Sequence, residues 1–138
     1  MHSWISAALR LSITSGLLFA VPTMAGEIVV VTGADAIVSV TREQLADIYL
    51  GRSTALKPLD LPESNELHDA FYKKATGRDG SQVKAVWSRL IFTGQGRPPK
   101  ELVDAIAVKR AVAADPKLVG YIDRSDVDVT VKVVLSLH

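Results

Sequence analysis

One stretch of the sequence decides the fold: WSRLIFTGQGRPP, residues 87–99. Together with the residues just before it, this stretch repeats apolar side chains at the i, i+3, i+4, i+7 and i+8 spacing of a helix with one broad buried face. The apolar positions are Val83, Val86, Trp87, Leu90 and Ile91. We expect the helix to begin at Ser81 and to end at Gly94, and we expect Trp87 to be buried against Phe71 or a sheet.

Strands and helices alternate along the chain on both sides of this stretch. A β-branched apolar run stopped by turn residues predicts a buried strand at 27–31. A short strand or extended stretch is expected at 57–61, and the closing strands are expected at 118–122 and 129–135. Such alternation favours an α/β sandwich, in which a central sheet is covered by helices on both faces.

The other helices are predicted from their start and stop signals. Thr41 with Gln44 three positions later has the capping-box pattern, and Gly51 ends that helix. A second helix is expected from Ser64 to Gly77, and a third over 100–114 with Asp104 as an additional N-cap.

Three segments of the chain resemble, in this order, the phosphate-binding protein family of ABC transporters, which has the type 2 periplasmic binding-protein fold. They are VTREQLADIYLGR at 40–52, WSRLIFTGQGRPP at 87–99 and AVAADPKLVGYI at 111–122. The resemblance covers residues 28–135, whereas solute-binding members of the family are longer because they close two lobes over the ligand. It therefore implies a single periplasmic-binding-protein-like lobe at residues 26–138.

The first 25 residues are predicted to be a secretory signal peptide. Arg10 precedes a short apolar run at 11–20, and small residues at Thr23 and Ala25 suit cleavage after Ala25. The apolar run is too short to span a bilayer. The chain has no cysteine, so neither a disulfide nor a lipid-bearing cysteine can form. We therefore expect a soluble periplasmic protein with no stable membrane anchor.

Composition argues against several classes of function. Without Arg10 the chain carries 15 basic and 15 acidic residues, and no basic run indicates nucleic acid as a partner. His68 is the one histidine expected inside the fold, as a solvated or half-buried helix residue, so His-based catalytic and metal sites are disfavoured. Acidic residues such as Asp60 and Glu66 look like ordinary turn and cap residues. We expect no enzyme activity, no metal site and no cofactor.

A ligand site is expected where strands end and helices begin, because free backbone N–H groups are exposed there. Two segments fit this description: Thr32-Gly33 after the first strand, and Ser64-Asn65 at the start of the second helix. The resemblance implies an anion-binding turn at the latter place, but only Ser64 matches the family's turn. Glu63 and Glu66 bring negative charge to it.

Two hypotheses of function follow. In the first, the protein binds an inorganic anion such as phosphate, or a similar oxyanion, and delivers it to a membrane transporter or sensor. In the alternative, the chain is a ligand-free periplasmic interaction or sensor module, derived from one binding-protein lobe, that docks on a partner protein. The near-complete run of family segments favours the first hypothesis, and the acidic residues beside Ser64 favour the second.

Overall fold

The structure is a computed structural model that describes residues 26–138 and the isolated Gly16. The predicted signal peptide and its cleavage site after Ala25 lie outside the described residues, apart from that one glycine. In the part of the chain that is described, no helix has the length and apolar character needed to cross a membrane.

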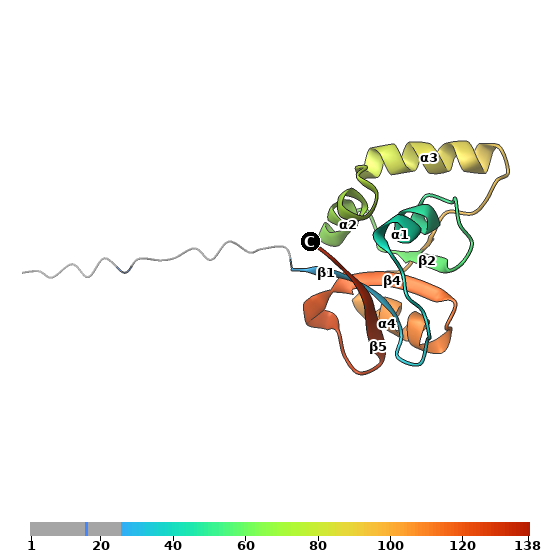
Figure 1. Cartoon of the computed structure of the whole chain (residues 1–138). Coiled ribbons are helices and arrows are strands. Elements are labelled where there is room, and N and C mark those ends of the chain that lie inside the picture. The colour runs from blue at the N-terminus through green and yellow to red at the C-terminus, as the bar shows by residue number, and fades with distance from the viewer. Residues whose placement is uncertain (1–15, 17–25) are drawn as a thin grey trace, which may run out of the picture.

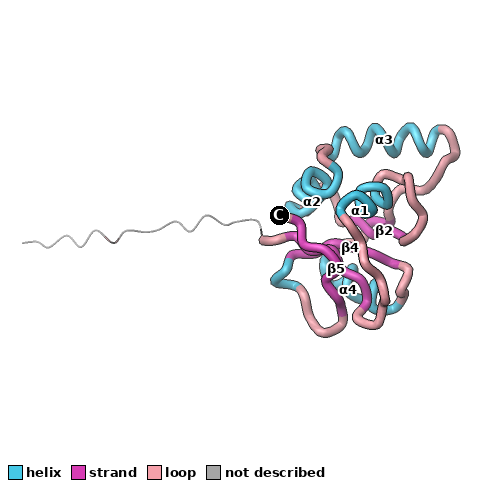
Figure 2. The backbone as a smooth tube through the Cα atoms, in the orientation of Figure 1, coloured by secondary structure: helices cyan, strands magenta, loops and turns pink. Residues whose placement is uncertain are grey.

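A mixed five-stranded sheet forms the centre of the molecule (Figures 1 and 2). The strands are β1 (Ile28–Gly33), β2 (Lys57–Asp60), β3 (Lys100–Glu101), β4 (Leu118–Asp123) and β5 (Val131–Leu137), in the order β3-β2-β4-β1-β5. β1 is antiparallel to β4 and β5, whereas β2 is parallel to β3 and β4. The four predicted strands are confirmed to within two residues at each end. β3 was not predicted, because a helix was expected there.

Helices cover both faces of the sheet, as predicted. They are α1 (Arg42–Tyr49), α2 (Glu66–Thr76), α3 (Gly80–Phe92) and α4 (Ala105–Ala114), with a short 3-10 turn, η1, at Arg124–Asp126. Neighbouring residues of β4 point to opposite faces: Gly120 lies against Val108 of α4, and Tyr121 stacks on Phe71 of α2. In Figure 1, α4 lies on the side of the sheet away from α1 and α2, and α3 extends along the outer side of that helical layer.

Capping side chains determine where the helices begin, and two of the predicted capping residues are wrong. The capping box of Thr41 and Gln44 is confirmed, and Asp104 caps α4. However, the N-cap of α2 lies one residue later than predicted, because the Asn65 side chain and not that of Ser64 accepts the Leu67 N–H. Similarly, Asp79 caps α3 in place of Ser81.

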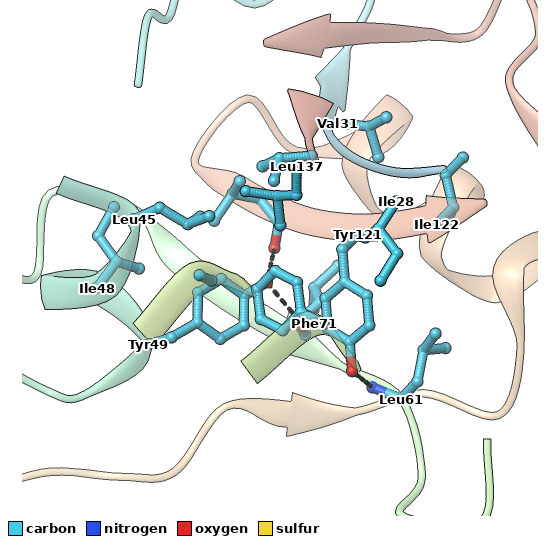
Figure 3. Packing of buried hydrophobic residues seen from close by; sticks show 14 of the residues in the cluster. Ile28, Val31, Leu45, Ile48, Tyr49, Leu61, Phe71, Tyr121, Ile122 and Leu137 are labelled. Atoms are coloured by element: carbon cyan, nitrogen blue, oxygen red, sulfur yellow. Dashed lines mark hydrogen bonds between the residues drawn. The ribbon is translucent and has the colours of Figure 1, made fainter. Parts of the chain in front are cut away.

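An aromatic cluster fills the core between the sheet and the α1/α2 layer (Figure 3). The rings of Phe71 and Tyr121 stack with centroids 3.7 Å apart, and Tyr49 meets Phe71 edge-on at 4.7 Å. Trp87 is buried, as predicted, with 8% of its surface exposed. Its partner is the end of α1, since its indole Nε1 donates to the Tyr49 carbonyl at 3.0 Å. The buried face of α3 is narrower than predicted, because Ile91 is 53% exposed.

Candidate ligand-binding site

The two segments predicted to bind a ligand lie at opposite ends of the sheet. β1 and β4 are antiparallel, and β4 and β2 are parallel, so the carboxyl ends of β1 and β2 point in opposite directions. Thr32 and Gly33 end β1, whereas Ser64 and Asn65 follow β2. The structure therefore does not bring the two pairs together.

Thr32 and Gly33 are packing residues. The Thr32 side chain is fully buried, and its hydroxyl donates to the Gly33 carbonyl at 3.3 Å. Gly33 lies against the backbone of α4, where an added Cβ would be only 2.4 Å from the Val112 carbonyl oxygen. Because both residues are buried, a small ligand would have to displace packed parts of the fold to reach either of them.

The turn that contains Ser64 and Asn65 is exposed and offers free donors. Its backbone is closed by a hydrogen bond from the Asn65 N–H to the Pro62 carbonyl at 2.9 Å. The amide NH2 group of Asn65 makes no hydrogen bond to another described residue, but the side-chain oxygen is occupied, because it accepts the Leu67 N–H at 2.9 Å. The exposed Ser64 hydroxyl and the Glu66 N–H, by contrast, make no hydrogen bond to the described part of the chain. They are the groups that a ligand could use.

The surroundings of this turn are acidic. Glu63 precedes Ser64, and Glu66 and Asp69 lie in the first turn of α2 with exposed side chains. One cation from α3 offsets them in part, as the Lys84 Nζ lies 3.8 Å from a Glu63 carboxylate oxygen. These carboxylates interact favourably with the positive end of the α2 dipole, and they reduce the field left for an anion.

Below the turn, the Asp60 carboxylate holds three elements together. The hydroxyls of Tyr72 from α2 and Tyr121 from β4 each donate to it at 2.6 Å. The Leu61 N–H donates to the same carboxylate at 2.8 Å and lies 3.3 Å from the Tyr121 hydroxyl, a contact drawn in Figure 3. With its oxygens occupied in this way, Asp60 fixes the start of the turn and is not a free ligand group.

Burial controls the chemistry of this cluster. Loss of solvent, reinforced by the Asp60 carboxylate, raises the pKa of Tyr72 and of Tyr121 well above the ordinary value, so both hydroxyls stay protonated and donate. His68 is also buried, contrary to the prediction of a solvated or half-buried side chain. Its Nε2 lies 3.8 Å from Asp60 and its Nδ1 lies 3.2 Å from Asp69.

Sequence reasoning missed this cluster because its members are far apart along the chain. Asp60 was interpreted as a turn residue, and neither tyrosine was singled out. A signal did exist, however. Tyr72 and Tyr121 occupy apolar positions, and a buried tyrosine hydroxyl needs a polar partner. An acidic residue at the end of β2 is a suitable acceptor for both.

Within the described residues, no group of three or more histidine, cysteine or acidic side chains could hold a metal ion. The donors of the exposed turn, the Ser64 hydroxyl and the Glu66 N–H, are suited to hydrogen bonding with a small polar ligand. Metal-dependent binding has no ligand set in this part of the chain.

Comparison with solved structures identifies the class of fold. The chain is similar to a Clostridium perfringens protein described as a phosphate ABC transporter substrate-binding protein with bound phosphate, with a TM-score of 0.64 and 20% identity over 79% of this chain. It is similar to an ABC-type phosphate transport receptor from Vibrio cholerae, with a TM-score of 0.63 and 20% identity over 79% of this chain. No protein-family model and no curated protein matches the chain.

These similarities show the fold. The chain spans 44% and 46% of the two matched chains, which is less than half of each. The predicted resemblance to phosphate-binding proteins, in a short form, is thus confirmed at the level of architecture.

Proposed function

We propose that the protein is an exported, single-lobe solute-binding domain that binds phosphate or a similar oxyanion at the turn before α2. The observation that carries this proposal is the pair of free donors, the Ser64 hydroxyl and the Glu66 N–H, at the start of a helix that follows the carboxyl end of β2. Helix N-termini with free N–H groups are suited to anions. The phosphate bound to the Clostridium perfringens protein supports an anion as the class of ligand.

The single lobe sets the expected affinity. A ligand held between two lobes loses contact with water on both sides, so its hydrogen bonds act in a medium of low dielectric constant. On this chain the ligand would face water, beside the carboxylates of Glu63 and Glu66. We therefore expect millimolar affinity for the lone protein, and tighter binding when a second copy or another protein supplies the opposite wall.

The setting of this function is the periplasm. Cleavage after Ala25 would release residues 26–138 as a free protein that delivers its ligand to a membrane transporter or a sensor. Intact-mass analysis of a periplasmic extract tests this point. A mass that retains Met1, or recovery of the protein only from membranes, would contradict it.

Thermal stability tests oxyanion binding directly. A ligand that binds only the folded state at ten times its Kd stabilises it by about 1.4 kcal/mol, which is about 5 °C or more in Tm for a domain of this size. We expect phosphate or sulfate to raise the Tm above a chloride control at equal ionic strength. Ser64→Ala should remove this increase, and Glu66→Gln should enlarge it by removing repulsion.

A matched control is Ser88→Ala, which removes an exposed hydroxyl from α3. It should leave the phosphate response intact. If the wild-type protein and the Glu66→Gln variant both respond equally to phosphate, sulfate and chloride, the turn is not an oxyanion site.

The alternative, a ligand-free interaction module, has its own supporting observation. α3 ends in two exposed apolar side chains, Ile91 at 53% and Phe92 at 92%. Such residues suit contact with a partner protein. If anions have no specific effect, Phe92→Ser should weaken co-purification with a periplasmic or membrane partner, and unchanged recovery of that partner would contradict the alternative.

A further inference from the structure

A hollow in the surface lies away from the turn at 61–66 and shares no residue with it. It has a volume of about 640 Å³ and lies between the connection 51–58, the loop 95–99 and the carboxyl end of α4. This volume is within the range of about 300–1,000 Å³ that is usual for small-molecule sites. Its apolar walls include Ile48, Leu56, Leu59, Trp87, Leu102 and Leu118.

The Trp87 side chain contacts both of the loops that form this hollow. Its Nε1 is fixed by the Tyr49 carbonyl, so the indole lies in one orientation. Gly51, with φ of 76°, lies so close to the ring that an added Cβ would be 2.9 Å from it. The other loop lies over the same ring at Gly96, which has a φ of 146°. A Cβ added to Gly96 would be 3.7 Å from the ring. The walls are therefore formed by the fold before any ligand arrives.

The charge around the hollow is positive. Lys57, Arg97 and Lys100 all line it, and none of them forms an ion pair with another described residue. Asp115 is the acidic residue of the lining, and one of its oxygens already accepts the Lys117 N–H at 2.9 Å. The lining of the hollow thus has three cationic side chains and one acidic side chain, whereas the chain as a whole is nearly neutral.

We propose that this hollow binds a small amphipathic carboxylate, with an apolar body against Trp87 and Leu118 and the carboxylate near Lys57 and Arg97. Burial of the apolar body contributes about 25 cal/mol per Å² removed from water. A bare oxyanion would leave these apolar walls in contact with water, and an apolar cation would meet the three positive side chains. This site is independent of the oxyanion site proposed at Ser64.

Isothermal titration calorimetry of the purified protein tests the proposal with three probes. Octanoate has the apolar body and the carboxylate, acetate has only the carboxylate, and octylammonium has the same body with the opposite charge. We expect octanoate to bind with one-to-one stoichiometry, and acetate and octylammonium to bind at least about tenfold more weakly, a difference of about 1.4 kcal/mol.

Variants locate the binding within the chain. Lys57→Gln combined with Arg97→Gln should weaken octanoate binding about fivefold, as expected for loss of exposed charge pairs worth about 1 kcal/mol. Thr54→Trp, which places a large ring in the lining, should weaken it further. Lys132→Gln is the matched control, because this exposed lysine of β5 lies outside the hollow.

The proposal is wrong if octanoate does not bind at millimolar concentration, or if octanoate and octylammonium bind equally. An octanoate affinity unchanged in the Lys57/Arg97 double variant, with circular dichroism showing an intact fold, would also overturn it. Ser64→Ala should leave octanoate binding unchanged. Failure at Ser64 and failure at the hollow are therefore separate outcomes.

Discussion

Replacement of Trp87 should be the most costly single change in α3. The side chain is 8% exposed, and its indole lies against both Gly51 and Gly96, so Trp87→Ala leaves a large cavity where two loops meet the end of α1. Such truncations cost about 3 to 5 kcal/mol. A domain with a typical unfolding free energy of about 5 to 15 kcal/mol would be left marginal.

The Trp87→Phe variant distinguishes the contribution of ring packing to stability from that of the Nε1 hydrogen bond. Phenylalanine keeps most of the ring but removes the Nε1 donor, and no other donor in the described part of the chain reaches the Tyr49 carbonyl. A buried acceptor left without a partner costs about 1 to 3 kcal/mol. We therefore expect a loss smaller than that of Trp87→Ala but clearly above the experimental error.

Urea unfolding followed by far-UV circular dichroism measures both losses, since the fluorescent residue itself is changed. Ser88→Ala, on the exposed side of the same helix, should change the unfolding free energy by less than about 0.5 kcal/mol. If Trp87→Ala loses less than about 1 kcal/mol, Trp87 does not join the loops to the core as described. If Trp87→Phe loses nothing, its hydrogen bond to Tyr49 contributes no net stability.

Three further predictions concern other contacts of the fold. Hydrogen bonds, first from Lys109 and then from Thr130, lower the pKa of Asp128 from 3.8 to about 2, so its contribution to stability is complete above about pH 4 and is lost as the pH falls through 2. The difference in urea midpoint between wild type and Asp128→Asn should accordingly shrink between pH 5 and pH 2, and a constant difference would contradict this assignment. Asp60→Ala leaves two buried tyrosine hydroxyls without their acceptor and should cost about 3 kcal/mol in urea unfolding, whereas a neutral result would mean that the cluster does not hold the turn. Gly33→Ala forces a Cβ against α4 and should cost about 1 to 3 kcal/mol, and a stable variant would show that α4 can move away.

Those features of the fold that depend on neighbouring residues could be predicted from the sequence. The strand 28–33 is buried along its whole length, and its β-branched run is typical of a central strand. The capping box at Thr41 involves only Thr41 and Gln44, so its chemistry is local. Helix starts were less certain where two capping residues adjoin. Ser64 and Asn65 are both good N-caps, and the path of the chain after β2 decides between them.

Features that depend on distant residues could not be predicted in this way. β3 is only two residues long and exists because Leu59 and Asp60 of β2 offer it an edge to pair with. The burial of His68 depends on which side of α2 meets the sheet. The strand directions also came only from the structure, and they decide that Thr32 and Ser64 lie at opposite ends of the sheet.

The two proposed sites, the exposed turn and the hollow beside Trp87, differ in the source of their binding free energy. At the exposed turn, hydrogen bonds to an anion act in water, where a charge pair at 4 Å is worth about 1 kcal/mol. The carboxylates of Glu63 and Glu66 oppose that small gain, so we expect only weak oxyanion binding at the turn. In the hollow beside Trp87, burial of an apolar body would supply free energy that the exposed turn does not offer, and the three cations would favour a negative head group. If both proposals hold, the protein binds octanoate more tightly than phosphate, and the relative affinities for the two ligands measure that difference directly.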